Sequence, residues 1–191
     1  MQAARGASLN SSGPDHHPAG KRPLGILFGV ALVAYTVDVV TKVLAVERLA
    51  DRDPVPVVGD LLQLTLVRNP GAAFSTGTSY TVVLTVVAIL AVGVVLFLSR
   101  RTFDKVWAFG LGCLLGGVLG NLTDRMFREP GPLRGHVVDF LQLPNWPVFN
   151  VADICINVAA GVIILQAIRG VSHTGERESR RDDRDDQVPE P

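Results

Sequence analysis

The segment YTVVLTVVAILAVGVVLFL at residues 80–98 decides the fold, because it contains no charged side chain. About 20 consecutive apolar residues are enough for a helix to cross the hydrocarbon core of a bilayer. Three further apolar runs occupy the centre of the chain. The sequence therefore predicts an all-α membrane protein with four transmembrane helices, at residues 24–46, 80–98, 106–122 and 148–168.

The first apolar run, residues 24–46, allows two interpretations. Lys21 and Arg22 precede it, as basic residues precede the apolar core of a secretory signal peptide. However, the run is longer than such a core, carries Asp38 and lacks a clean small-x-small cleavage motif. We therefore expect it to remain as an uncleaved first helix.

The third run contains Gly112, Gly116 and Gly120 at a spacing of four residues. In lipid, small residues at this spacing let helix backbones approach one another closely. Cys113 and Cys155 lie inside apolar runs without a zinc-site spacing, and we interpret both as small packing residues.

Two loops separate these helices on one side of the membrane. Within residues 47–79, leucines alternate with polar residues from Leu62 to Leu66, as in a short strand. We expect a small β-containing extracytoplasmic loop there, and a proline-rich loop at residues 125–147.

The ends of the chain are polar. Residues 1–23 are expected to form a disordered cytoplasmic tail, and residues 169–191 a disordered charged cytoplasmic tail, around a membrane domain at residues 24–168. The basic turn with Arg100, Arg101 and Lys105 favours both termini in the cytoplasm. This preference is weak, because the opposite side also carries arginines.

Several function classes lack support in the sequence. The formal net charge is zero, which gives no reason to expect a nucleic-acid partner. There is no His-Glu-x-x-His motif and no glycine-rich nucleotide loop, so we predict no metal and no cofactor. His136 is interpreted as a loop residue.

Four carboxylates lie in or beside the predicted spans, where an ionisable side chain is costly. If both termini are cytoplasmic, they all converge near the outer face of the membrane. They are Asp38, Asp124, Asp139 and Asp153.

Each carboxylate also has a structural interpretation. Asp38 and Lys42 are spaced i, i+4, which suits an intrahelical ion pair. Asp124 with Arg125 would fix a loop. Asn150 would cap the last helix and place Asp153 at its third position, where a carboxylate favours the helix dipole.

The functional interpretation uses a pair of carboxylates. Two carboxyl groups in a low-dielectric site cannot both ionise, so they share a proton. One then acts as a general base on a water while the other, as an acid, polarises a carbonyl. Asp139 and Asp153 suit this role best, since one ends a loop at the membrane surface and the other lies one turn into the next helix.

Five short blocks resemble the lipoprotein signal peptidase (signal peptidase II) family over about residues 24–168. They follow one another in the family's order. The blocks are Asp38-Val-Val-Thr-Lys42, Arg68-Asn-Pro-Gly-Ala-Ala-Phe74, Gly120-Asn-Leu-Thr-Asp-Arg125, Val137-Val-Asp-Phe140 and Phe149-Asn-Val-Ala-Asp153.

The resemblance implies a bacterial inner-membrane aspartic endopeptidase with its active site near the outer face. It would cut a prolipoprotein on the amino side of a cysteine that carries diacylglycerol. Its catalytic pair maps onto Asp139 and Asp153. Its supporting residues map onto Asp38, Lys42, Asn69, Gly71, Asn121, Asp124, Arg125, Asn150 and Ala152. The expected partners are the prolipoprotein and membrane lipid, and we expect a monomer.

The chain departs from the family pattern at three places. Residues 129–134 lengthen the segment between Asp124 and Asp139, the stretch from Phe140 to Phe149 is short, and Ile154 replaces a frequent serine. A small transporter or channel that uses the same acids as a proton relay is an alternative. Acids gathered on one side instead of along a path disfavour it, and a structural scaffold has no need of so many buried acids.

Overall fold

The computed structural model describes residues 22–71 and 79–175. All four predicted helices are present and are long and apolar enough to cross a membrane. The first three helices extend past their predicted ends, and the last begins at Val151 instead of Val148, after a helix cap. The helices are α1 (Leu24–Leu49), α2 (Ser79–Ser99), α3 (Lys105–Phe127) and α4 (Val151–Ile168).

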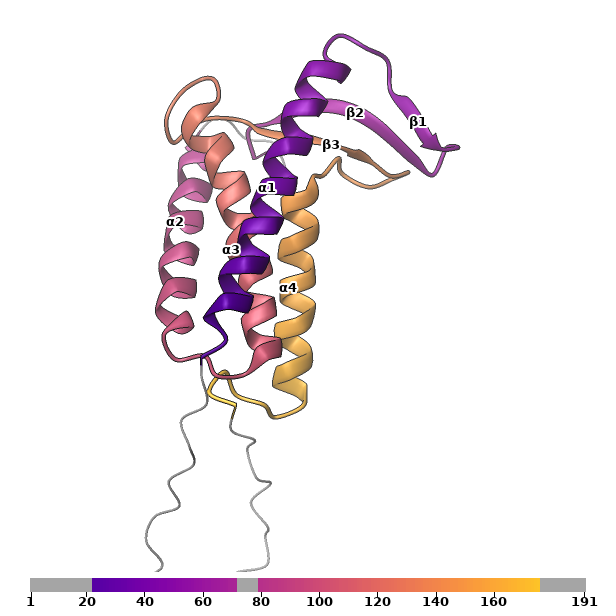
Figure 1. Cartoon of the computed structure of the whole chain (residues 1–191). Coiled ribbons are helices and arrows are strands. Elements are labelled where there is room, and N and C mark those ends of the chain that lie inside the picture. Colours follow the sequence, from indigo (N-terminus) through magenta and orange to yellow (C-terminus); the bar gives the residue numbers. More distant parts are fainter. Residues whose placement is uncertain (1–21, 72–78, 176–191) are drawn as a thin grey trace, which may run out of the picture.

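Helix α3 lies at the centre of the bundle and packs against the other three helices (Figure 1). Its glycines explain how. A Cβ added at Gly112 or Gly116 would lie 2.6 or 2.7 Å from a backbone oxygen of α1, and one at Gly117 would lie 2.6 Å from the oxygen of Ala152 in α4. The prediction that these glycines allow close helix contact is confirmed, with Gly117 as an addition.

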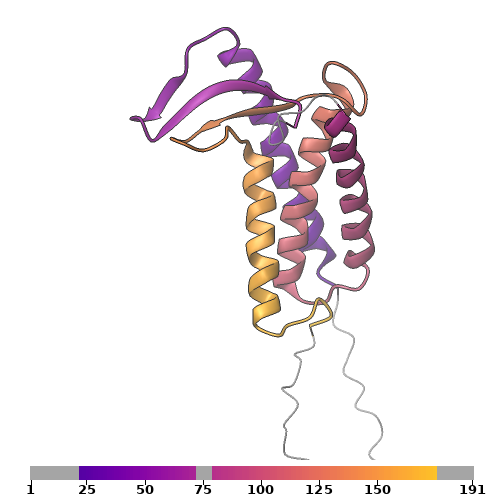
Figure 2. The same cartoon turned by 180° about the vertical axis from the view of Figure 1, so that it is seen from behind.

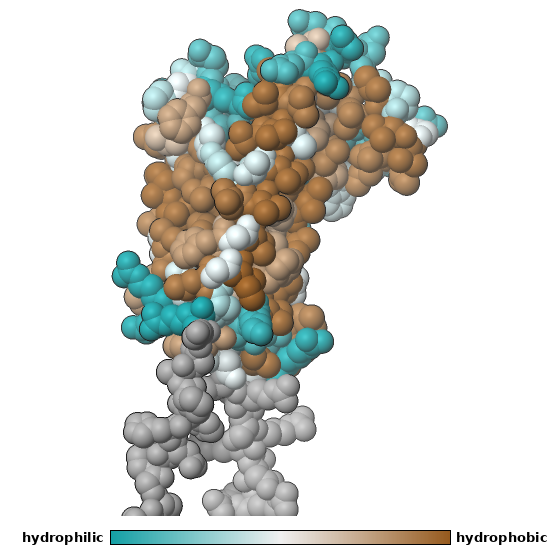
Figure 3. Space-filling view, in the orientation of Figure 1, coloured by the Kyte–Doolittle hydropathy of each residue, from teal (hydrophilic) through white to brown (hydrophobic). Residues whose placement is uncertain are grey.

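The outer surface of the bundle is apolar along the length of the helices. Figure 3 shows a hydrophobic zone over the helices with hydrophilic residues gathered at both ends. Leu32, Leu90 and Ile164 are 66%, 63% and 58% exposed. Such a contiguous exposed apolar surface is covered by a bilayer, so these outward-facing side chains contact lipid and not water.

A three-stranded antiparallel sheet projects sideways at one end of the bundle (Figures 1 and 2). The short strand expected near Leu62 is longer, and it pairs with two strands that were not expected from the sequence. The strands are β1 (Val55–Val58), β2 (Leu62–Asn69) and β3 (Val137–Gln142), in the order β1-β2-β3.

The third strand corrects the expectation of a wholly irregular second loop at residues 125–147. In β3, Val138 and Phe140 are buried and pack with Ala45 and Leu49 at the end of α1. This apolar contact holds the sheet on the bundle. It also fixes the position of Asp139, which lies between the buried residues Val138 and Phe140.

Both ends of the described chain lie away from the sheet (Figure 1). Residues 1–21 and 176–191 of the two expected tails lie outside the described residues. The first part of the C-terminal segment folds back on the turn between α2 and α3, in contrast to the expected free tail. The Val171 carbonyl accepts from Trp107 Nε1 at 2.9 Å, and the His173 carbonyl accepts from Phe103 N at 3.0 Å.

Candidate active site

Asp139 is the third residue of β3 and is only 2% exposed. Its two carboxylate oxygens accept from different amides. Asn150 Nδ2 donates to Oδ1 at 2.6 Å, and Asn69 Nδ2 donates to Oδ2 at 2.8 Å. Because both oxygens are held, the plane of the carboxyl group is fixed by the sheet on one side and by the start of α4 on the other.

Asp153 lies in the first turn of α4, where it completes a capping box with Asn150. Asp153 N donates to Asn150 Oδ1 at 3.0 Å, and Asn150 N donates to Asp153 Oδ2 at 3.2 Å. The remaining oxygen, Oδ1, accepts from Asn121 Nδ2 of α3 at 2.9 Å. Asn150 therefore contacts both aspartates.

The two carboxylates influence each other electrostatically. Burial, together with the negative charge of Asp153, raises the pKa of Asp139 from 3.8 to about 6, although the hydrogen bonds from Asn69 and Asn150 and the charge of Lys42 lower it. A carboxyl group with a pKa near 6 exchanges its proton close to neutral pH. This is the property needed for general acid or base work.

A buried ion cluster lies beneath this pair. Lys42 Nζ is 2.8 Å from Asp38 Oδ2 and 3.0 Å from Asp124 Oδ2, and all three side chains are almost fully buried. Asp38 Oδ1 accepts from the backbone of Ala152 at 2.8 Å, and Arg128 pairs with the second oxygen of Asp124. The cluster thus ties α1, α3 and α4 together at the depth of the site.

Asn121 connects the ion cluster to the aspartates. Its Oδ1 accepts from Lys42 Nζ at 2.8 Å and from Asn150 Nδ2 at 3.2 Å, which directs its Nδ2 donor to Asp153. An amide side chain has one acceptor and one donor end, so the lysine sets which end faces the carboxylate. Lys42 acts on the site through Asn121.

Asn69 and Gly71 belong to a turn at the end of β2. Gly71 N donates to Asn69 Oδ1 at 2.8 Å, which leaves Nδ2 of Asn69 directed at Asp139. Gly71 has a φ of 109°, a conformation that residues with a side chain rarely adopt. The glycine is needed for the turn that orients Asn69.

Arg125 is the remaining predicted residue and lies near the end of α3. Its Nη1 reaches the carbonyl of Asn121 at 3.4 Å, and its charge interacts with both Asp153 and Asp139. Its buried Nε has no hydrogen-bond acceptor among the described residues.

In residues 22–71 and 79–175, no three His, Cys, Asp or Glu side chains gather in a way that could hold a metal ion.

The sequence pattern of signal peptidase (SPase) II matches residues 30–169. The chain belongs to the signal peptidase II family. A protein named lipoprotein signal peptidase from Mycobacterium tuberculosis (strain ATCC 25618 / H37Rv) is 50% identical over 159 residues, 83% of this chain and 79% of that protein. Another of that name, from Streptomyces coelicolor (strain ATCC BAA-471 / A3(2) / M145), is 43% identical over 156 residues, 82% of this chain and 76% of that protein.

A solved structure supports the fold of this peptidase. A bacterial membrane enzyme determined by the in meso method at 1.9 Å resolution superposes with a TM-score of 0.71. It is 24% identical and covers 80% of this chain and 99% of its own. The chain is a multi-pass membrane peptidase with a four-helix bundle and a small sheet.

The structure brings all eleven predicted site residues of this peptidase to the end of the bundle that carries the sheet. The structural interpretations of the sequence hold as well, since Asp38 pairs with Lys42 and Asn150 caps α4 with Asp153 at the third position. Asp124 pairs with Lys42 and Arg128 instead of the expected Arg125. It does hold the following loop, since its Oδ2 accepts from Val138 N at 3.2 Å.

Two features near the site were not predicted. Arg128 was missed, although its spacing of four residues after Asp124 is the usual signal for a helical ion pair. A cavity of about 400 Å³ beside Asp153 was missed too, because its wall combines the second loop with α4. It is lined by Trp146, Phe149, Asp153, Ile154, Asn157 and Val158.

Proposed function

We propose that this chain is an aspartic endopeptidase that removes the signal peptide of prolipoproteins. It would cut on the amino side of a cysteine that carries diacylglycerol, with Asp139 and Asp153 as the catalytic pair. The observation that carries this proposal is that one residue, Asn150, binds both carboxylates. The names of the relatives support the substrate class.

The chemistry uses one proton on the pair. The ionised carboxylate takes a proton from a water as the water oxygen attacks the scissile carbonyl carbon, while the protonated carboxyl group donates to the carbonyl oxygen. The tetrahedral intermediate then collapses with loss of the C–N bond, and the leaving nitrogen receives a proton from the pair. Either residue can start as the base, since the base of the first step becomes the proton donor of the second.

The other residues would position this pair. Asn69, Asn121 and Asn150 fix the carboxylate planes, while Asp38, Lys42 and Asp124 hold the helices that carry them. Arg125 places a positive charge near both carboxylates. Gly71 and Ala152 contribute backbone donors to Asn69 and Asp38.

The cavity beside Asp153 suggests how a lipid-modified substrate reaches the pair. Ile154 and Val158 on α4 are 42% and 43% exposed and line the cavity together with Trp146. A cysteine with acyl chains would lie along this apolar wall with the chains in the bilayer, and the peptide would lie against the sheet. We infer that the sheet and the pair lie on the outer side of the cytoplasmic membrane, with both termini inside and the chain acting as a monomer.

Cleavage of a defined precursor tests this proposal. Purified full-length protein would be given a prolipoprotein whose cysteine has been modified with diacylglycerol, the same precursor without the modification, and a Cys→Ser precursor. Mass spectrometry should find a new amino-terminal cysteine only with the modified substrate. Cleavage elsewhere, or equal cleavage of all three, would contradict the proposed specificity.

A further inference from the structure

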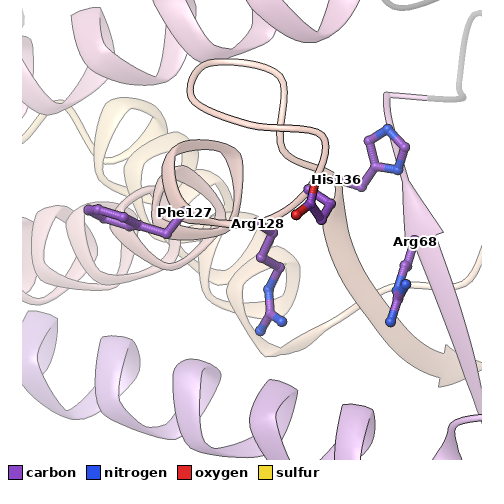
Figure 4. Close-up of a pocket in the computed structure, with 5 residues that line it drawn as sticks. Arg68, Phe127, Arg128 and His136 are labelled. Carbon is purple, nitrogen blue, oxygen red and sulfur yellow. The ribbon is translucent and has the colours of Figure 1, made fainter.

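A second cavity, of about 300 Å³ and lined mainly by charged side chains, lies where the end of α3 meets the sheet. Its lining comes from strand β2, from the end of α3 and from the loop between α3 and β3. The lining residues are Arg68, Phe127, Arg128, Glu129 and His136. Figure 4 shows Arg68 and Arg128 extending in the same direction from β2 and from the end of α3, with the ring of His136 on the nearby loop.

This cavity is separate from the aspartate pair. In the pairing of β2 with β3, Val67 lies opposite Asp139, and Arg68 lies opposite Val138. Successive side chains of a strand point to opposite faces of the sheet. Arg68 therefore lies on the face away from Asp139, and a ligand between the two arginines does not occupy the peptidase site.

The charges around the cavity favour an anion. Arg68 is exposed and has no ion pair within 4.0 Å among the described residues. Arg128 contacts Asp124 through Nε, and Lys42 also neutralises that carboxylate. The only acid in the lining is Glu129, which is exposed. Two guanidinium groups can thus donate to one ligand, with a single carboxylate opposing them, while Figure 4 shows the ring of His136 directed away from the ends of the two arginines.

The loop that forms the wall is held by backbone hydrogen bonds. His136 N donates to the Glu129 carbonyl at 3.0 Å, and Gly135 N donates to the Arg125 carbonyl at 3.1 Å. The carbonyl of Leu133 accepts from Thr85 of α2 at 3.0 Å, which ties the loop to the bundle. The cavity is therefore formed by a fixed loop and does not depend on a ligand to assemble it.

The depth of the cavity indicates which anion it meets. Phe127 is the last residue of the spanning helix α3 and is 84% exposed. An apolar side chain so exposed at the end of a spanning helix is explained by lipid contact, which places the hydrocarbon edge near Phe127. Arg128, the next residue, would then lie at the level of the lipid phosphates, and guanidinium groups bind phosphate oxygens well.

We propose that Arg68 and Arg128 bind the phosphate of an anionic phospholipid from the leaflet on the sheet side of the membrane. The guanidinium groups donate to the phosphate oxygens, and the acyl chains run beside Phe127 into the bilayer. The bound lipid fills the gap between α3 and β2, on the opposite face of the sheet from the peptidase site.

Titration of short-chain lipids into the full-length protein in detergent tests this site. The probes are dihexanoyl phosphatidylglycerol, dihexanoyl phosphatidylcholine and inorganic phosphate, followed by calorimetry. Arg68→Gln should weaken phosphatidylglycerol binding about tenfold, since one charge-assisted bond is lost. Glu129→Gln should strengthen it several-fold. Arg134→Gln, in the same exposed loop but outside the lining, should leave it unchanged.

The outcomes separate the possible ligands. Saturable phosphatidylglycerol binding with this order of variants, and weaker binding of phosphatidylcholine, supports the site. Inorganic phosphate that binds as tightly as phosphatidylglycerol would overturn the assignment to lipid. Wild-type affinity in Arg68→Gln, in protein with an unchanged melting temperature, would overturn the site itself. The measurement does not involve cleavage, so its failure leaves the proposed peptidase activity untouched.

Discussion

The side-chain amide of Asn150 donates a 2.6 Å hydrogen bond to Oδ1 of Asp139. The backbone and side chain of the same asparagine also cap α4 through Asp153. The start of one spanning helix and the third strand of the sheet are thus joined at one residue. A helix cap, which in most proteins serves stability, here also sets the relative position of two carboxylates.

The two roles of Asn150 are separable by substitution. Serine is a good helix cap but has no amide to reach Asp139, whereas alanine removes both functions. We expect Asn150→Ser to lower the cleavage rate about 100-fold with little loss of cap energy, since misplaced catalytic groups have effects of this size. Asn150→Ala should lose a further 1 kcal/mol or so of stability. Cleavage assays and thermal unfolding in detergent would show this, and normal cleavage by Asn150→Ser would contradict the positioning role.

Replacing Lys42 by methionine should strongly destabilise the bundle. The lysine is 1% exposed, and without it Asp38 has no cation and Asp124 retains only Arg128. Removing one partner of a buried pair costs about 3 to 5 kcal/mol. Lys105→Met, at the exposed start of α3, is the matched control and should leave the melting temperature nearly unchanged.

A double variant separates charge from packing at this site. Asp38→Asn combined with Lys42→Met should lower the free energy of unfolding by less than the sum of the single variants. The double variant carries no charge at position 38 or 42, whereas each single variant leaves one charge without its partner. Additive losses of unfolding free energy would show that the ion pair has no such role.

Gly120→Ala should disturb the ion cluster through a steric contact. An added Cβ would overlap the carboxylate of Asp38. This carboxylate pairs with Lys42 and accepts a hydrogen bond from Ala152 N. Overpacking of this kind costs about 1 to 3 kcal/mol. Gly161→Ala in α4 meets nothing within 4 Å and should be tolerated. Equal melting temperatures for the two variants would contradict the close packing of α3 on α1.

The raised pKa of Asp139 predicts how stability depends on pH. Since the folded structure raises this pKa from 3.8 to about 6, mainly through burial, the folded protein binds more protons than the unfolded chain in that window. The contribution of Asp139 to stability should therefore fall by up to about 3 kcal/mol as the pH rises from about 4 to about 6. Asp139→Asn lacks this titration.

Thermal unfolding of both proteins across that range measures the effect. The wild type should lose stability relative to Asp139→Asn as the pH rises, and the difference should level off above about pH 7. Parallel curves for the two proteins would contradict a raised pKa at this position.

Much of this fold follows from local patterns in the sequence. Uncharged runs such as residues 80–98 predict the spanning helices, and the i, i+4 spacing of Asp38 and Lys42 predicts their ion pair. Asn150 and Asp153 show the spacing of a capping box before an apolar run. Each of these features depends on residues that are close in the chain.

The parts that were missed depend on distant pairing. Strand β3 forms by pairing with β2, with Asn69 opposite Val137. Its sequence, between two groups of prolines, shows no alternation of apolar and polar residues that would predict a strand. Asp139 was consequently expected at the end of a loop. The bond from Asn121 to Asp153 likewise joins two helices, and its direction is set by Lys42 from a third. Residue types alone do not specify such amide orientations.

The cleavage rates of Asp139→Asn, Asp153→Asn and the double variant test the catalytic pair most directly. Asp60→Asn, exposed between β1 and β2, serves as the control and should cleave modified prolipoprotein at the wild-type rate. If the two carboxylates act as one unit, each single variant should lose at least about 1000-fold in rate, and the double variant should be no slower than either. Substantial cleavage by either single variant, with the protein folded, would contradict a shared role for Asp139 and Asp153.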